Sequence, residues 1–131
     1  ADISRVVICH IDRTYPNGEK VEELVKKGVF VEWDFFGIES SRYWLNDIEL
    51  PIDRDRIKLI KKMFKLGYGN KILISHDICS KTRLHKWGGH GYGHIIRNII
   101  PLMKNYGITN DQIDQLIRIN PINLLSISNI N

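Results

Sequence analysis

The sequence predicts an α/β fold in which parallel strands alternate with helices. Three short apolar runs, rich in β-branched residues, occupy residues 6–9, 29–33 and 72–74. Unbroken runs of this kind are typical of strands that are covered on both faces, as in parallel sheets. Helical patterns separate the runs, and this order of strands and helices is the signature of successive βαβ units.

The first two helical patterns each begin and end at recognisable signals. Residues 19–27 place Val21, Leu24 and Val25 on one side, and Gly28 then supplies a C-terminal stop. Asp53 is a suitable N-cap for the second helix, which we expect to end before residue 67. The apolar face of this second helix comprises Ile57, Ile60, Met63 and Phe64.

Two further helices are predicted near the end of the chain. The first covers residues 94–106, and Pro101 inside it predicts a kink or a break, because proline removes a backbone donor. The second is a short helix opened by residues 109–111, and we expect it to end before Asn120 and Pro121.

Composition and charge exclude some classes of protein. With 131 residues, 43% of them hydrophobic and 26% charged, the chain fits a soluble globular domain. The formal charge is +4, but lysines and arginines are dispersed, so no nucleic-acid partner is expected. The sequence has no membrane-spanning run and no signal-peptide pattern, so we expect a cytoplasmic protein without a membrane partner. Cys9 and Cys79 suit buried thiols in a reducing compartment.

The connections differ in length on the two sides of the predicted sheet. Links from helix to strand are short, whereas those from strand to helix are long, about residues 35–52 and 78–92. Long loops at the carboxyl ends of parallel strands mark the functional face of an α/β protein. His10, Asp34 and Asp77 each follow an apolar run, so all three are expected on that face.

His10 and Asp77 are the candidate metal ligands. An imidazole and a carboxylate at two strand ends suit a divalent ion such as zinc, and Asp77 could also act as the general base. The alternative is that His10 forms a hydrogen bond in the core while Asp77 caps a turn. His76 is expected on the opposite side of its strand, where it would either hold a metal ligand in place or pack against its neighbours. Asp34 either supports a ligand or only orients the loop that follows it.

The loop after the third strand is rich in glycine and histidine. We interpret it as a shaped substrate loop or lid, whose candidate substrate-binding residues include Trp87, His90 and Tyr92. Lys81 and Arg83 in the same loop could hold an anionic group, or could be ordinary solvated charges. In the preceding long loop, the run 42–44 (Arg-Tyr-Trp) could form an aromatic wall or could pack beneath the loop.

Several segments, taken together and in order, resemble the phosphotriesterase family of the amidohydrolase superfamily. The nearest branch is that of the phosphotriesterase-related proteins, and the resemblance covers about residues 4–125. The segments are VICHIDRT at 7–14, VEWDFFG at 31–37, DRI at 55–57, KILISHD at 71–77, GGHGY at 88–92, IIP at 99–101 and NP at 120–121.

The resemblance implies a TIM (β/α)8 barrel whose sixth, seventh and eighth strands lie in this chain. Residues 1–131 would be the C-terminal portion of a single metal-dependent hydrolase barrel domain, with the N-terminal strands absent. His10 matches a ligand of one metal in a binuclear centre, with two zinc ions expected per complete barrel. Asp77 matches the ligand of the other metal, which accepts a proton from the metal-bridging hydroxide. The family's ligands on the first, fourth and fifth strands have no counterpart here.

Two departures from the family pattern bear on the substrate. Phe35 stands where phosphotriesterases proper carry a relay histidine, and Arg13 stands where they carry an acidic relay residue. Fast organophosphate hydrolysis is therefore not expected. The resemblance favours hydrolysis of an ester, a lactone or an amide, including N-acyl amides such as N-acetyltaurine. Because three strands leave a barrel open and two ligands cannot hold a catalytic zinc, the chain alone should be aggregation-prone and inactive.

Two alternatives from other classes remain open at this point. One is a catalytically inactive α/β binding module, which would keep a cleft without a metal. The other is a doubly wound nucleotide-binding domain, although the glycine-rich phosphate loop expected after its first strand is not visible. A small-molecule substrate is expected under the hydrolase interpretation, and a homodimer of the full-length protein stays open.

Overall fold

The computed structural model describes residues 2–41, 43 and 48–127. Three parallel strands form one sheet in the order β1 (Val7–Ile8), β2 (Phe30–Trp33) and β3 (Ile72–Ile74). In the register of the sheet, Val31 of β2 lies between Ile8 of β1 and Ile72 of β3. The three predicted strands and their parallel arrangement are therefore confirmed.

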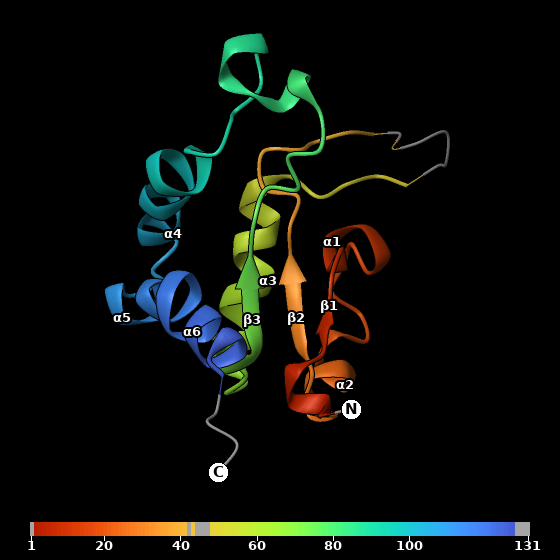
Figure 1. The fold of residues 1–131 in the computed structure, drawn as a ribbon, viewed down its shortest axis with the longest axis vertical. Coiled ribbons are helices and arrows are strands. Elements are labelled where there is room, and N and C mark those ends of the chain that lie inside the picture. Colours follow the sequence, from red (N-terminus) through yellow and green to blue (C-terminus); the bar gives the residue numbers. More distant parts are fainter. Residues whose placement is uncertain (1, 42, 44–47, 128–131) are drawn as a thin grey trace.

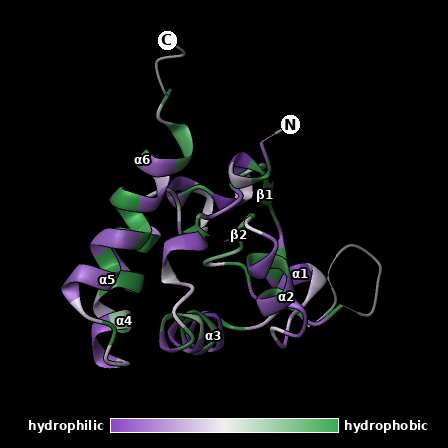
Figure 2. Ribbon diagram, turned by 90° about the horizontal axis from the view of Figure 1, so that it is seen from below, coloured by the Kyte–Doolittle hydropathy of each residue, from purple (hydrophilic) through white to green (hydrophobic). Residues whose placement is uncertain are grey.

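Helices flank the sheet on three sides. In Figure 1, α3 stands behind the strands, α1 and α2 lie beside β1, and α4 to α6 lie beside β3. Figure 2 views the molecule from below and shows the same helices as an arc around the strands. Their bounds are α1 (Ile11–Thr14), α2 (Val21–Lys26), α3 (Asp53–Lys65), α4 (Ile100–Asn105), α5 (Asn110–Asp114) and α6 (Asn120–Leu125).

The main core lies between the sheet and α3. Val31 and Trp33 of β2 have no exposed surface, and neither have Ile57 and Ile60 of α3. Since side chains alternate along a strand, Glu32 points to the opposite face of the sheet. Among the described helices, the arc leaves that opposite face uncovered (Figure 2). The sheet therefore has one face packed on α3, while the opposite face carries Glu32 together with the buried apolar side chains of Phe30 and Leu73.

The helix predicted over residues 94–106 continues through its proline. A π-helical turn, Ile95–Ile99, precedes α4, and Pro101 lies in the first turn of α4. The wider turn moves the backbone bonds to an i→i+5 pattern, which accommodates a residue that has no N–H to donate.

The predicted end of the last helix is wrong, for a related reason. A second π-helical turn, Gln115–Ile119, leads into α6, and Pro121 lies in the first turn of α6. The helix therefore passes Asn120 and runs on to Leu125. Proline is tolerated at a helix start, and the π turn creates such a start within a longer helical segment.

The prediction of buried thiols is also wrong, because Cys9 and Cys79 are both free and exposed. Cys9 follows β1 and lies near Glu32 on the uncovered face, and Cys79 lies in the loop after β3. Within the part of the chain that the structure describes, no helix has both the length and the apolar character needed to cross a membrane.

Candidate metal and substrate site

His10 and Asp77 lie at the carboxyl ends of the two outer strands. Both residues adopt the left-handed backbone conformation, with φ of 57° at His10 and 42° at Asp77. Positive φ is uncommon outside glycine and often occurs at functional sites. Because β2 separates β1 from β3 and neighbouring strands are about 4.8 Å apart, the two strand ends are on the order of 10 Å apart. The sheet thus brings both candidate ligands to the same end, the one at which its strands have their carboxyl termini.

The ring of His10 is held from two sides. It stacks on the ring of Phe35, with the centroids 5.0 Å apart and the planes at 15°. Its Nδ1 lies 2.8 Å from Oδ2 of Asp34, and its backbone N–H donates to the same oxygen at 3.1 Å. Asp34 therefore contacts the candidate ligand, in keeping with the supporting role considered for it.

Asp34 is an unusual carboxyl group. Burial raises the pKa of Asp34 to about 6, although the contact with His10 opposes this shift. Its Oδ1 atom is buried and has no hydrogen-bond partner among the described residues. A buried acceptor without a partner is costly and favours a protonated carboxyl or an additional ligand.

Arg83 holds Asp77 in place. Its guanidinium donates to the backbone carbonyl of Asp77, to Oδ2 of Asp77 at 3.1 Å and to the hydroxyl of Tyr43 at 3.2 Å. The Arg83 side chain is only 19% exposed. The contact with Asp77 was not foreseen, because two residues six apart in an irregular loop leave no periodic signal. Tyr43 is buried beneath the loop that follows β2. The other two members of the proposed aromatic wall, Arg42 and Trp44, lie outside the described residues.

A cavity of about 260 Å³ lies between the β2 loop (residues 34–52) and the β3 loop (residues 75–94). Side chains that line it include those of Glu39, His76, Arg83 and His90. A larger hollow of about 1120 Å³ opens beside α1 and α3, but the residues described around it include none of the predicted site residues. The smaller cavity is therefore the better candidate for a substrate pocket.

The two cavity histidines differ in their surroundings. His76 accepts a hydrogen bond at Nε2 from the backbone N–H of Ile95 at 3.3 Å. Burial, together with the nearby His94, lowers the pKa of His76. His90 is exposed, and its ring lies 4.2 Å from that of His94. His76 thus connects the end of β3 to the following helix, while the exposed His90 lines the cavity.

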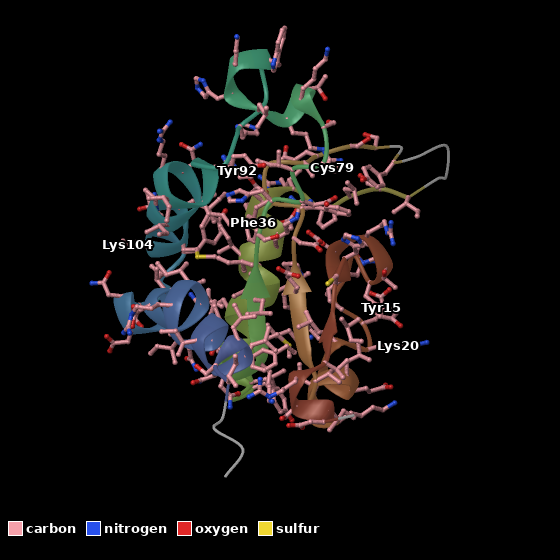
Figure 3. The ribbon with its side chains drawn as sticks, in the orientation of Figure 1. Tyr15, Lys20, Phe36, Cys79, Tyr92 and Lys104 are labelled. Carbon is pink, nitrogen blue, oxygen red and sulfur yellow. The ribbon has the colours of Figure 1, made fainter. Side chains whose placement is uncertain are left out.

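The rest of the β3 loop projects beyond the strand ends (Figure 1). Figure 3 places Cys79 and Tyr92 on the two limbs of this loop, where it leaves and rejoins the body of the molecule. Trp87 is 55% exposed and Tyr92 is 70% exposed. The Nζ atom of Lys81 lies 5.3 Å from the centroid of the Trp87 ring. These exposed groups suit a substrate loop, and their part in binding stays a prediction.

A second group of potential ligands lies nearby on the uncovered face of the sheet. One ligand atom each from Cys9, Glu32 and Asp34 falls within 4.8 Å of the others. Burial and the neighbouring Glu32 raise the pKa of Cys9 to about 11, so its thiol is protonated at neutral pH. Since thiols bind metals as thiolates, this group competes poorly with an imidazole and a carboxylate.

Comparison with known proteins places the chain in a family. The profile of the phosphotriesterase family matches residues 1–125. The chain belongs to the phosphotriesterase family. An N-acetyltaurine hydrolase of Dictyostelium discoideum is 46% identical over 128 residues, which cover 97% of this chain and 35% of that protein. A phosphotriesterase-related protein of Nematostella vectensis is 47% identical over 121 residues, which cover 92% of this chain and 35% of that protein.

Solved structures agree with this membership. A resiniferatoxin-binding protein from Rhodobacter sphaeroides aligns with a TM-score of 0.89 and 27% identity, over 95% of this chain and 34% of that one. The phosphotriesterase homology protein of Escherichia coli, with phosphate in its active site, aligns with a TM-score of 0.82 and 25% identity, over 96% of this chain and 40% of that one. The chain thus spans about a third of the length of the phosphotriesterase-family proteins that it matches.

Proposed function

We propose that the chain forms the last three strands of a (β/α)8 barrel and that the complete barrel is a metal-dependent hydrolase. The three parallel strands with helices around one face support this arrangement. The long loops at the carboxyl ends of the strands add support, because barrel enzymes build their active sites there. The observation that carries the proposal is that His10 and Asp77 follow the two outer strands of the sheet and both lie at its carboxyl end.

The side chains at this end of the sheet fit a pair of divalent ions, for which we propose zinc. His10 offers a neutral nitrogen and Asp77 a carboxylate, which are ordinary zinc ligands. The contact of His10 with Asp34 resembles the carboxylate–histidine pairs that orient ligands in metal sites. When bound, the ions would lower the pKa of a water molecule and polarise the substrate carbonyl.

The residues of this chain would orient the reacting groups and move a proton. Asp77 would accept the proton of the attacking water, since its carboxylate lies at the strand end where the substrate is expected. Arg83 would keep that carboxylate in one orientation through its contacts with the Asp77 carbonyl and Oδ2. Phe35 and Asp34 would fix the ring of His10 in the same way.

We propose an ester, a lactone or an amide as the substrate, with an anionic N-acyl amide such as N-acetyltaurine as the leading candidate. The names of the relatives from Dictyostelium discoideum and other organisms support this choice. The exposed Lys81 on the β3 loop offers a cation for a sulfonate or carboxylate. Phe35 cannot relay a proton as a histidine would, so organophosphates should be poor substrates.

A chimera tests the proposal. Residues 1–131 of this chain would replace the matching third of the Dictyostelium discoideum relative, and acetate release from N-acetyltaurine would be measured with zinc present. We expect turnover that falls at least about 100-fold in the His10→Ala and Asp77→Ala variants. Lys104→Ala is the matched control, since Lys104 is exposed on α4, away from the strand ends (Figure 3). Full turnover in either ligand variant would refute the proposal.

A further inference from the structure

Arg56 of α3 is a fully buried arginine that contacts three segments near the strand ends. Its Nε donates to Oδ2 of Asp12 in α1 at 2.8 Å, and its Nη1 donates to Oδ1 of Asp53 at 2.8 Å. Its Nη2 donates to the backbone carbonyl of Ile38 in the β2 loop at 2.7 Å. Only the planar fork of an arginine can reach three acceptors in this way, because lysine carries a single nitrogen.

One branch of this network leads to His10. The Oδ2 atom of Asp12 accepts a second hydrogen bond, from the backbone N–H of Phe35 at 3.0 Å. Asp12 thereby fixes the backbone of the residue whose ring stacks on His10. Arg56 thus reaches the candidate metal ligand through Asp12 and Phe35 without touching it.

The other branch leads to the histidines of the β3 loop. Oδ2 of Asp53 lies 2.7 Å from Nε2 of His94, whose Nδ1 lies 2.9 Å from the amide nitrogen of Asn98. The ring of His90, which lines the cavity, packs on His94. Both ring nitrogens of His94 are therefore engaged, and His94 provides a fixed surface against which His90 rests.

Gly37 shows how closely the β2 loop approaches these histidines. Its N–H donates to Oδ1 of Asp53 at 3.0 Å, and its φ is 84°. A Cβ atom at this position would lie 3.0 Å from the ring of His94 and 3.1 Å from that of His90. Only glycine fits such a position without displacing its neighbours, so the Asp53 branch also holds the β2 loop against the β3 loop.

We infer that Arg56 is a positioning residue that sets both His10 and His90 through these two branches. The inference rests on the proposed function, because it assigns a purpose to the orientation of those histidines. A buried ion pair is by itself weak evidence for stability, since desolvation offsets much of the attraction. Arg56 instead links two parts of the site, because one of its branches ends at His10 and the other ends at His90. This arrangement indicates that Arg56 orients these two histidines.

The first test compares Arg56→Lys with the parent chimera. Lysine keeps the charge but cannot reach three acceptors, so we expect kcat to fall at least about tenfold with little change in KM. Circular dichroism would confirm that the variant is folded at the assay temperature. Arg118→Lys is the matched control, because Arg118 pairs with Asp114 on the exposed side of the C-terminal helices. Unchanged kcat in Arg56→Lys would overturn the inference.

The second test separates the two branches by NMR of the chimera, with its histidine rings labelled with ¹⁵N. This chain contributes five histidines to the chimera, and single substitutions would assign their signals. Asp12→Asn should shift the ring signals of His10, whereas Asp53→Asn should shift those of His94 and His90. The exposed His85 serves as an internal reference. If neither variant moves these signals, the inference is wrong. Because this readout needs no turnover, an inactive parent chimera would refute the proposed function and leave the inference testable.

Discussion

At the scale of single residues, the site depends on two side chains whose backbone is held in an unfavourable conformation. A non-glycine residue with positive φ costs on the order of 1 kcal/mol or more, so its surroundings must stabilise it. At His10 the backbone N–H is bound by Asp34, and at Asp77 the backbone carbonyl is bound by Arg83. In each case a neighbour that stabilises the backbone also contacts the side chain, which links local strain to the orientation of a candidate ligand.

Lys81 and Arg83 should respond differently to substitution by alanine. Lys81 is exposed, so in the chimera Lys81→Ala should raise KM for anionic substrates about threefold and leave neutral substrates unaffected. Arg83 holds Asp77, so Arg83→Ala should lower kcat on both substrate types by about 100-fold. Kinetics on N-acetyltaurine and on a neutral lactone would check this. A selective loss on anionic substrates in Arg83→Ala would mean that Arg83 binds substrate directly.

Asp53 should make the stability of the fold depend on acidic pH. Burial opposes its ionisation, but His94, the N–H of Gly37 and Arg56 outweigh burial and lower the pKa of Asp53 below its ordinary value of 3.8. A lowered pKa contributes stability that is complete above that value and is lost as pH falls through the folded-state pKa. Urea unfolding of the chimera between about pH 5 and pH 3 should show a steeper loss for the parent than for Asp53→Asn. Parallel curves would contradict this assignment.

Sequence reasoning located the candidate ligands but not the residues that hold them. The positions of His10 and Asp77 could be predicted because residues within a few positions of the end of a parallel strand must lie at the carboxyl end of the sheet. Asp53 was predicted as an N-cap, yet it is the first residue of α3 and its carboxylate binds Arg56, Gly37 and His94 instead. Such contacts depend on the rotation of a helix and the path of two loops, which periodicity does not encode.

At the scale of elements, the two helical segments that contain proline are built in the same way. In each, a π-helical turn of five residues comes directly before the α-helix that contains the proline. These two α-helices begin at Ile100 and at Asn120. The sequence predicted an interruption at Pro101 and an end before Pro121, because proline usually breaks a helix. The widened turn instead lets each segment continue, which brings Asn120 against the start of β3.

Asn120 should be an important link between α6 and the sheet. It is fully buried, and its Nδ2 donates to the carbonyls of Gly69 at 2.8 Å and Ile72 at 2.7 Å. Asn120→Leu would leave two buried carbonyls without a partner, so we expect the free energy of unfolding to fall by about 2–4 kcal/mol. Chemical denaturation of the chimera would measure the change. Asn123→Leu is the control, because Asn123 is exposed on the same helix. If both substitutions lower the free energy of unfolding by the same small amount, Asn120 is not the link that we describe.

At the scale of the whole molecule, helices cover one face of the sheet, while the other face carries polar groups beside the apolar side chains of Phe30 and Leu73. Glu32 and Cys9 lie on that second face, which the arc of described helices leaves open (Figure 2). The matched phosphotriesterase-family proteins are about three times as long as the matched segment. Further strands of a barrel would cover this face and would supply the additional ligands that a catalytic zinc requires.

The isolated chain should therefore associate and should not turn over substrate. An open parallel sheet exposes unpaired edges that favour pairing between molecules. We expect light scattering to detect oligomers or aggregates of the 131-residue chain and assays with zinc to detect no hydrolysis. A monomeric chain with zinc-dependent turnover would contradict the proposal that the site needs further strands.

The central claim is that His10 and Asp77 bind metal, and anomalous X-ray diffraction from crystals of the zinc-loaded chimera tests it most directly. We expect one zinc ion within about 2.1 Å of a His10 ring nitrogen and another within about 2.2 Å of an Asp77 carboxylate oxygen. Zinc bound instead to Cys9, Glu32 and Asp34, or zinc that contacts neither His10 nor Asp77, would contradict it.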